Sequence, residues 1–133
     1  MITSQLEEQL GRSEEFDEQL IRENGIPDFL AMIAQLMTEK GVSRAELIKR
    51  MDIDRNYGYQ LLNGIRRPTR KHIIQMGLAL ELDVDGFQKL LKSANKKPLY
   101  VRDMFDAKVF FAVKHKMNYE SAMEFIWNDP DCR

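Results

Sequence analysis

Residues 43–64 read SRAELIKRMDIDRNYGYQLLNG, and this stretch predicts two short helices joined by a tight turn. Ser43 followed three residues later by Glu46 fits a capping box, so we expect the first helix to begin there. Asp54 is a suitable N-cap for the second helix. Gly64 is expected to adopt a left-handed conformation just past the end of that helix. Two helices held at a fixed angle by such a turn form a compact unit from which the rest of the fold can be built outward.

The apolar pattern on both sides of this stretch predicts three further helices. One is expected to begin after Asp28 and to end at Gly41. Another should begin after Thr69, and the next after Asp83 or Asp85. The residues expected to form a shared core recur at three- to four-residue spacing and are Phe29, Met32, Ile33, Leu36, Met37, Leu47, Ile48, Met51, Ile73, Ile74, Met76, Leu78, Ala79, Leu80, Leu82, Phe87, Leu90 and Leu91.

Weaker patterns predict helices toward both ends of the chain. Residues 5–23 form one amphipathic helix or two short helices broken near Gly11, and a turn is expected at residues 24–27. After a polar break that ends in proline, residues 100–116 and 118–128 are expected to be helical, although the apolar run VFFAV could alternatively be a short buried strand. The sequence therefore predicts an all-α protein with an acidic helical arm, a five-helix domain and a C-terminal helical hairpin, at residues 1–27, 28–93 and 94–133.

Charge is unevenly distributed along the chain. The formal net charge is −1, but residues 1–28 carry a net charge of −6 and residues 40–72 carry +6. Attraction to a polyanion depends on the local field rather than on the total charge. The basic segment, which contains the two helices of residues 43–64, is therefore a candidate surface for a nucleic acid.

Several classes of protein find no support in the composition. Cys132 cannot by itself form an internal disulfide or a cysteine-rich metal site, and we interpret it as an incidental thiol. His72 and His115 lack metal-ligand partners at motif spacing, and no phosphate-binding glycine motif or activated nucleophile is evident. No apolar run approaches the roughly 20 residues of a membrane span. We therefore expect a cytoplasmic protein that is not an enzyme and needs no cofactor or metal.

The order and spacing of these elements resembles the Cro/repressor-type (XRE-like) helix-turn-helix family over about residues 29–91, without gaps. The resemblance implies that five helices pack into one small core and that the third of them enters the major groove of DNA. The residues that carry the match are the apolar and turn positions Leu47, Met51, Ile53, Leu61, Asn63, Gly64, Pro68, Ala79 and Leu80.

Three residues depart from the pattern of this family. The family usually has alanine at the position of Ile48 and a β-branched residue at the position of Gly58. Ile48 adds volume where Gly58 removes it, so the two changes are expected to compensate in a close-packed contact. The family usually has glycine where Asp52 stands, and aspartate tolerates the left-handed conformation better than most residues.

Residues of the third helix are the candidates for reading DNA bases. The resemblance places Arg55, Asn56 and Gln60 at positions that face base edges, and we expect Tyr59 to join them. Helical spacing puts these four residues on one face. Arginine can pair with guanine through two hydrogen bonds, and asparagine or glutamine can pair with adenine in the same way. The alternative is an ordinary solvated helix face.

A second group of residues is expected to contact phosphate. Four cations follow the third helix within six residues, where the resemblance implies backbone contacts. The N-termini of the third and fourth helices are also expected to offer unpaired N–H groups to phosphate. Tyr57 belongs to this group unless its ring packs inside the protein. The full candidate set is Arg44, Tyr57, Arg66, Arg67, Arg70 and Lys71.

These observations favour a sequence-specific regulator, repressor-like in character, that binds double-stranded DNA as a homodimer. One such domain reads few base pairs, so two copies on adjacent half-sites are expected. The C-terminal hairpin is rich in apolar side chains, which suggests a subunit interface, although a simple core role is equally compatible with them. The candidate interface residues are aromatic: Phe105, Phe110, Phe111, Phe125 and Trp127.

Two other functions remain open. In the first, the helical domain is a scaffold, and the acidic arm or the C-terminal hairpin binds a partner protein without any role for DNA. The basic segment argues against this alternative, because a pure interaction module has no need of it. In the second, the ligand is RNA, but the usual aromatic stacking platform is not evident.

Overall fold

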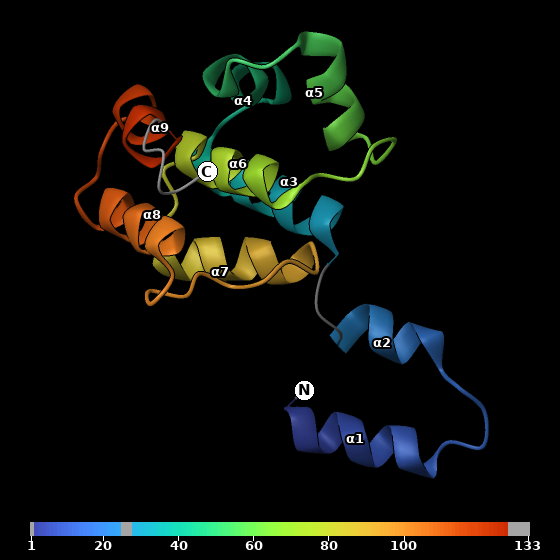
Figure 1. Cartoon of the computed structure of the whole chain (residues 1–133). Helices are drawn as coiled ribbons and strands as arrows, with labels where there is room; N and C mark the ends of the chain where they lie inside the picture. The colour runs from blue at the N-terminus through green and yellow to red at the C-terminus, as the bar shows by residue number, and fades with distance from the viewer. Residues whose placement is uncertain (1, 25–27, 128–133) are drawn as a thin grey trace.

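The computed structural model describes residues 2–24 and 28–127, so Cys132 and residues 25–27 of the predicted turn lie outside the described residues. Within these ranges the protein is all-α, with nine helices and no β-strand (Figure 1). Their bounds are α1 Thr3–Arg12, α2 Glu18–Asn24, α3 Phe29–Lys40, α4 Arg44–Met51, α5 Arg55–Leu62, α6 Arg70–Ala79, α7 Val84–Ser93, α8 Met104–Lys114 and α9 Tyr119–Trp127.

Side-chain caps set the beginnings of the five middle helices. Each capping side chain accepts a hydrogen bond from the backbone N–H three residues later, at 2.8–3.2 Å, which satisfies a donor that the helix leaves unpaired. The structure selects Asp83 rather than Asp85 as a cap. The carboxylate of Glu46 does not complete the predicted capping box but lies 3.8 Å from Arg50. The predicted caps that the structure confirms are Asp28, Ser43, Asp54, Thr69 and Asp83.

Left-handed residues end the helices where the sequence predicted them. Gly41 ends α3 with φ of 65°, and Gly64 follows α5 with φ of 80°. Asp52, in the turn between α4 and α5, has φ of 55°. Aspartate is one of the few side chains that tolerate this region, so the turn forms without glycine.

The two ends of the chain differ in detail from their predictions. Residues 5–23 form two helices rather than one, and the break begins at Ser13, so Gly11 belongs to α1. Helix α8 is shorter than predicted, and α9 begins one residue later than predicted, while its predicted end at residue 128 lies outside the described residues. The run VFFAV lies inside α8, so the alternative of a buried strand is wrong.

One hydrophobic core joins the helices from α3 to α9. The central helix is α6, whose residues from Ile73 to Ala79 are all buried, and it packs against α4, α7 and α9 (Figure 1). Val109 of α8 and Ile126 of α9 are fully buried in the same cluster. The C-terminal hairpin thus packs on the middle helices and shares their core.

The N-terminal helices stand outside this core. Figure 1 shows α1 and α2 projecting beyond the end of α3, and α1 has no buried residue. None of the helices in the described ranges has the length and apolar content to cross a bilayer.

Candidate nucleic-acid interface

Helices α4 and α5 pack against each other at an unusually close contact. A Cβ atom placed on Gly58 would lie 2.7 Å from Cγ1 and 2.8 Å from Cγ2 of Ile48, which is closer than real atoms approach. Because both of those atoms are near the backbone of α4, they cannot swing away. Ile48 thus occupies the space that a side chain at residue 58 would need, as the sequence predicted, and the pair fixes how α5 sits on α4.

Helix α5 has one polar face and one buried face. Arg55 and Asn56 are exposed in its first turn, and Tyr59 and Gln60 are partly exposed in its second. The guanidinium of Arg55 lies 5.9 Å from the centre of the Tyr59 ring, one turn away. Arg55 and Asn56 therefore point outward, whereas Tyr59 also packs against the core and Gln60 keeps part of its surface exposed. The opposite face is formed by Gly58, Leu61 and Leu62, all buried.

Contacts around Arg66 order the end of this polar face. Its Nε donates a hydrogen bond to Oε1 of Gln60, and its guanidinium lies 5.3 Å from the centre of the Tyr57 ring. That ring is half-buried, with its centre 5.3 Å from that of His72. Tyr57 therefore packs between α5 and α6 while Arg66 covers it, and Arg66 in turn restrains the amide of Gln60.

The other predicted phosphate contacts are a residue that touches the C-terminal end of α5 and two residues that follow it in the chain. Arg44, in the first turn of α4, donates to Oδ1 of Asn63 at the end of α5. Arg67 and Lys71 are exposed. We call the exposed cations Arg44, Arg66, Arg67 and Lys71 the basic surface. The ammonium of Lys71 lies 5.5 Å from the centre of the Trp127 ring, so the end of α9 borders this surface.

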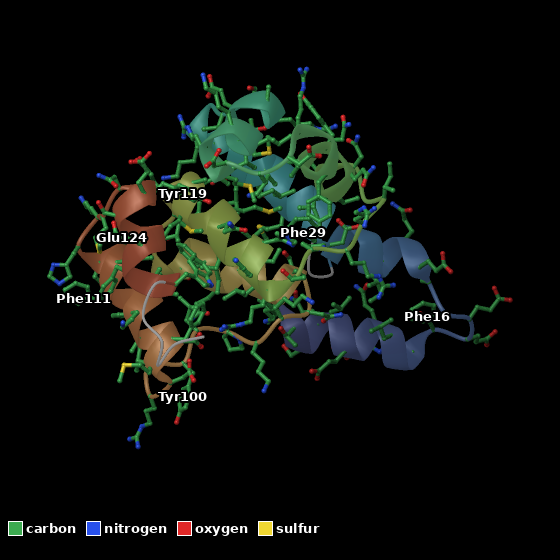
Figure 2. All side chains as sticks on the ribbon, turned by 45° about the horizontal axis from the view of Figure 1, so that its top comes forward. Phe16, Phe29, Tyr100, Phe111, Tyr119 and Glu124 are labelled. Atoms are coloured by element: carbon green, nitrogen blue, oxygen red, sulfur yellow. The ribbon has the colours of Figure 1, made fainter. Side chains whose placement is uncertain are left out.

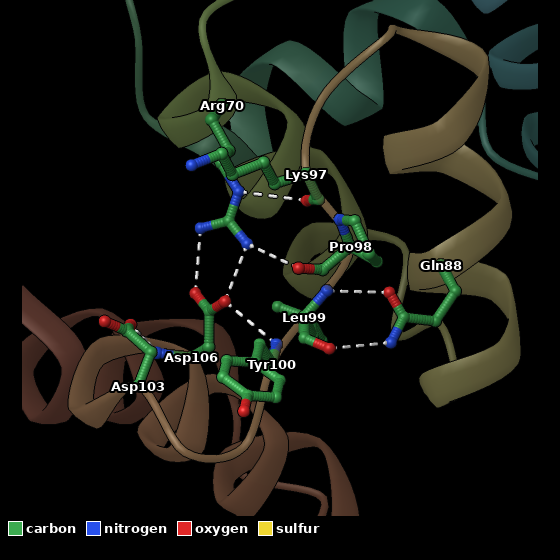
Figure 3. Close-up of polar contacts among 8 residues, drawn as sticks. All are labelled: Arg70, Gln88, Lys97, Pro98, Leu99, Tyr100, Asp103 and Asp106. Atoms are coloured by element: carbon green, nitrogen blue, oxygen red, sulfur yellow. Dashed lines mark hydrogen bonds and ion pairs between the residues drawn. The ribbon is translucent and has the colours of Figure 1, made fainter.

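Arg70 is turned toward Asp106 and the loop before α8 (Figure 3), whereas Arg67 and Lys71 are exposed. Its two terminal nitrogens donate to the two carboxylate oxygens of Asp106 at 2.8 and 2.9 Å, and Nε donates to the carbonyl of Lys97 at 3.1 Å. Asp106 is buried and also accepts the backbone N–H of Tyr100 at 2.9 Å. We correct the expectation for Arg70 accordingly: its guanidinium is committed to joining α6 to α8 and does not face the basic surface with Arg67.

A second polar pair holds the same loop. The amide of Gln88 on α7 donates to the carbonyl of Leu99 at 3.2 Å and accepts the N–H of Leu99 at 2.8 Å (Figure 3). Asp103 caps α8 by accepting the N–H of Asp106 at 3.0 Å. The segment between α7 and α8 is thus fixed by side chains from three helices, although it has no regular secondary structure.

The N-termini of α5 and α6 are already capped by side chains. The carboxylate of Asp54 accepts the N–H of Tyr57 at the start of α5. At α6, Thr69 accepts the N–H of His72, and Nδ1 of His72 accepts the N–H of Thr69 at 3.2 Å. Burial, with a smaller contribution from the charge of Lys71, holds the pKa of His72 below its ordinary value of 6.5. The expectation of open N–H groups for phosphate is weakened at both helices.

The five aromatic residues predicted for a subunit interface divide into two groups. Phe105 and Trp127 pack edge to face within the chain, with ring centres 5.4 Å apart, and both lie against the core. Phe110 is also partly buried. Phe111 points outward from α8, with 48% of its surface exposed, and its ring centre lies 5.6 Å from that of Phe125 (Figure 2). Much of the aromatic content therefore serves this chain's own packing.

Two residues that hold this region were not identified as such from the sequence. Asp106 is an acid in phase with the buried residues Val109 and Ala112 of α8, and that register was the available signal. His72 stands three residues after a threonine cap, where a glutamate or glutamine would have been recognised as closing a capping box.

Neither a candidate metal site in the described residues nor a match to a known protein indicates a function. Across residues 2–24 and 28–127, no three histidine, cysteine, aspartate or glutamate side chains are grouped to hold a metal ion. In comparisons with known proteins, no family model, no curated protein and no solved structure matches.

Proposed function

We propose that the protein binds double-stranded DNA in a sequence-specific manner and acts as a repressor-like transcriptional regulator. In this proposal α4 and α5 form a helix-turn-helix, α3–α7 form the repressor-like five-helix domain, and α5 enters the major groove. The observation that carries the proposal is the outward face of α5, which presents Arg55, Asn56, Tyr59 and Gln60 from a helix locked onto α4. That face belongs to the segment of residues 40–72 with net charge +6.

Base reading would use Arg55 and Asn56 from their exposed positions, and Gln60 after a change of hydrogen-bond partner. Arg55 can donate two hydrogen bonds to a guanine, and Asn56 or Gln60 can bond an adenine through both amide atoms. Gln60 can do so once Arg66 releases its Oε1, and Arg66 would find a new partner in a phosphate oxygen. Each such base pairing discriminates against a wrong base by about 1–3 kcal/mol.

Phosphate anchoring would use the cations that border α5. The proposed set is Arg44, Arg66, Arg67 and Lys71, with Arg70 removed because Asp106 holds it. Each neutralised phosphate releases counterions and adds roughly −0.9 to the slope of log affinity against log salt. These contacts would position α5 without specifying sequence.

We also propose that two copies of the chain act together through the outer face of α8. Met104 and Phe111 lie two turns apart on that helix and are 62% and 48% exposed, and Tyr100, which precedes the helix, is 60% exposed. Figure 2 shows Phe111 pointing away from the protein. Residues 100–127 carry four basic and four acidic residues. Two copies of this face can therefore meet without net repulsion, unlike the basic or the acidic segment.

The size of the particle tests this assembly. Wild-type protein is expected to have the mass of a dimer, and Phe111→Glu to have that of a monomer with unchanged helical content, because the new charges meet at a two-fold contact. Phe16→Glu, a matched change at an exposed phenylalanine outside the face, should leave the dimer intact. A wild-type chain that stays monomeric both free and on DNA would contradict the dimer.

Selection of bound sequences from random double-stranded DNA tests the function itself. We expect enrichment of a short motif that is repeated with two-fold symmetry. Exposed apolar surface on α8 also suits the alternative of a protein-interaction module without DNA binding. No enrichment, together with no salt-dependent retention on random DNA, would favour that alternative and contradict the proposal.

A further inference from the structure

We propose that α9 supports the helix-turn-helix and that Tyr119 is a positioning residue for the reading of bases by the first turn of α5. This inference rests on the proposed function, because it takes α5 as the helix that reads DNA. It goes beyond that function by giving the C-terminal hairpin, which lies outside the five helices of the repressor-like domain, a role in sequence discrimination.

The first residue of α9 is bonded to the last residue of α4. The hydroxyl of Tyr119 donates a hydrogen bond to the carbonyl oxygen of Met51 at 2.8 Å, although 68 positions separate the two residues in the chain. That carbonyl is one of the four at the end of α4 that the helix itself leaves without a partner. It belongs to the peptide group that joins Met51 to Asp52, whose left-handed conformation turns the chain toward α5. A side chain of the hairpin therefore holds the peptide group at which the turn begins.

The surroundings of the Tyr119 hydroxyl suit a fixed donor. Burial raises the pKa of Tyr119 above its ordinary value of 10, so the hydroxyl keeps its proton near neutral pH. The amide nitrogen of Gln75, a buried residue of α6, donates to the same hydroxyl over a long distance of 3.5 Å. Because the hydroxyl accepts on that side, its own proton is directed toward Met51. Side chains or backbone of α4, α6 and α9 thus meet at one hydroxyl group.

Helix α9 is itself fixed to the core. Ala122 and Ile126 on its inner face are fully buried, and the helix packs against α6 and α8. Trp127 at its end packs edge to face on an aromatic ring of α8. Tyr119 therefore reaches Met51 from a support that is held along one face and at its far end.

The position of the turn matters most for the first residues of α5. Arg55 and Asn56 directly follow the turn, whereas the second half of α5 is held by the close contact of Gly58 with α4. A side chain that recognises a base must be held within about 0.5 Å of its productive position. A turn that can shift would therefore weaken base recognition by Arg55 and Asn56, while attraction to phosphate, which depends on charge, would change little. Loss of the Tyr119 bond is thus expected to lower sequence discrimination rather than general affinity.

Removal of the hydroxyl tests this role. Tyr119→Phe is compared with Ser93→Ala, which also removes a hydroxyl that donates to a carbonyl near a helix end, at 2.7 Å from that of Leu90 on α7. Both variants are measured under conditions in which circular dichroism shows full helical content. We expect Tyr119→Phe to bind the sequence selected from random DNA about fivefold more weakly than wild type, and a random duplex within about twofold.

Discrimination should be lost at the base positions that Arg55→Ala also affects, and Ser93→Ala should bind both duplexes as wild type does. An equal loss on the two duplexes, or no loss on either, would overturn the role of Tyr119 in discrimination.

Amide hydrogen exchange without DNA separates this inference from the proposed function. The N–H groups of Asp52 and Gly58 are bonded to carbonyls of α4 and of the α5 cap, at 3.2 and 2.9 Å, so their exchange reports opening of the turn and of the start of α5. We expect exchange at both amides to be about tenfold faster in Tyr119→Phe than in wild type, and unchanged in Ser93→Ala.

Unchanged exchange in Tyr119→Phe, or an equal increase in Ser93→Ala, would overturn the inference even if the wild-type protein binds DNA with a base preference. Faster exchange confined to Tyr119→Phe, in a protein whose wild type shows no base preference, would uphold the support of the turn by α9 and contradict the proposed function.

Discussion

The outer face of α5 and the first turn of α6 both carry arginine, and the structure uses the two arginines in opposite ways. Arg55 is exposed and lies over the ring of its neighbour Tyr59. Arg70 is turned inward, where it makes four hydrogen bonds to Asp106 and to two backbone carbonyls. Lys71, the next residue in the chain, faces outward again.

This difference shows that a run of basic residues does not define a basic surface. Asp106 accepts both terminal nitrogens of Arg70 from 36 residues away, and its buried carboxylate needs a partner of opposite charge. Among the described residues, the buried acid is Asp106, and it pairs with Arg70 rather than with Arg55. The distant partner, not the local charge pattern, decides whether an arginine stabilises the fold or remains available to a ligand.

The largest expected loss of stability comes from removing the partner of the inward-facing Arg70. Asp106→Ala leaves a partly buried guanidinium and the N–H of Tyr100 without their acceptor, so we expect the free energy of unfolding to fall by about 3 kcal/mol. Urea denaturation measures it. Asp85→Ala removes an exposed ion pair with Lys89 and should leave the urea midpoint nearly unchanged, because solvent screens such a pair. Similar losses in the two variants would show that the Arg70 junction is no more than a surface pair.

A smaller effect tests the packing that orients the outward face. Gly58→Ala places a Cβ against Ile48 and should lower the free energy of unfolding by about 1–2 kcal/mol, despite the better helix propensity of alanine. In an Ile48→Ala background the same change should stabilise the protein, because the clash is gone and the new methyl fills space. A double-mutant cycle in urea measures the reversal. The same effect of Gly58→Ala in both backgrounds would contradict the contact.

The smallest expected effect is a change in the pH dependence of stability. It concerns His72, which closes the cap of α6 between the outward face of α5 and the inward-facing Arg70. Its pKa is lowered in the folded state, so the stability it contributes is present above the ordinary value of 6.5 and is lost as the pH falls through the folded pKa. His72→Gln keeps an acceptor for Thr69 but cannot protonate, so its urea midpoint should change less between pH 7 and pH 5 than that of wild type. His115→Gln, at an exposed histidine, should keep the wild-type difference. If His72→Gln also kept the full wild-type difference in urea midpoint between pH 7 and pH 5, protonation of His72 would not weaken the cap.

Local signals in the sequence were enough to predict the helices of the middle region. Asp28 and Thr69 each act within one turn, so capping could be predicted without knowledge of the fold. The exposed face of α5 follows from helical spacing in the same way. The two-fold interface and the DNA contacts stay predictions, because they depend on molecules other than this chain.

Contacts between distant segments could not be predicted in this way. The role of Arg70 depends on Asp106, and the aromatic residues of the hairpin could not be divided without knowing that α9 packs on α6. Trp127 illustrates this, since its neighbours Phe105 and Lys71 come from two other helices. The number of apolar residues in a segment indicates that the segment is covered by another surface. It does not indicate whether that surface belongs to the same chain or to a second subunit.

The base preference of α5 variants tests the central claim most directly. Preferences are measured at every position of the selected site for wild type, Arg55→Ala, Gln60→Ala and Arg67→Ala. We predict that Arg55→Ala and Gln60→Ala each lose about 1–3 kcal/mol on the preferred site and lose discrimination at one or two base positions. Arg67→Ala should weaken binding to all sequences equally and lower the salt slope by about one unit. Unchanged base preferences in both α5 variants would contradict the assignment of α5 as the helix that reads DNA.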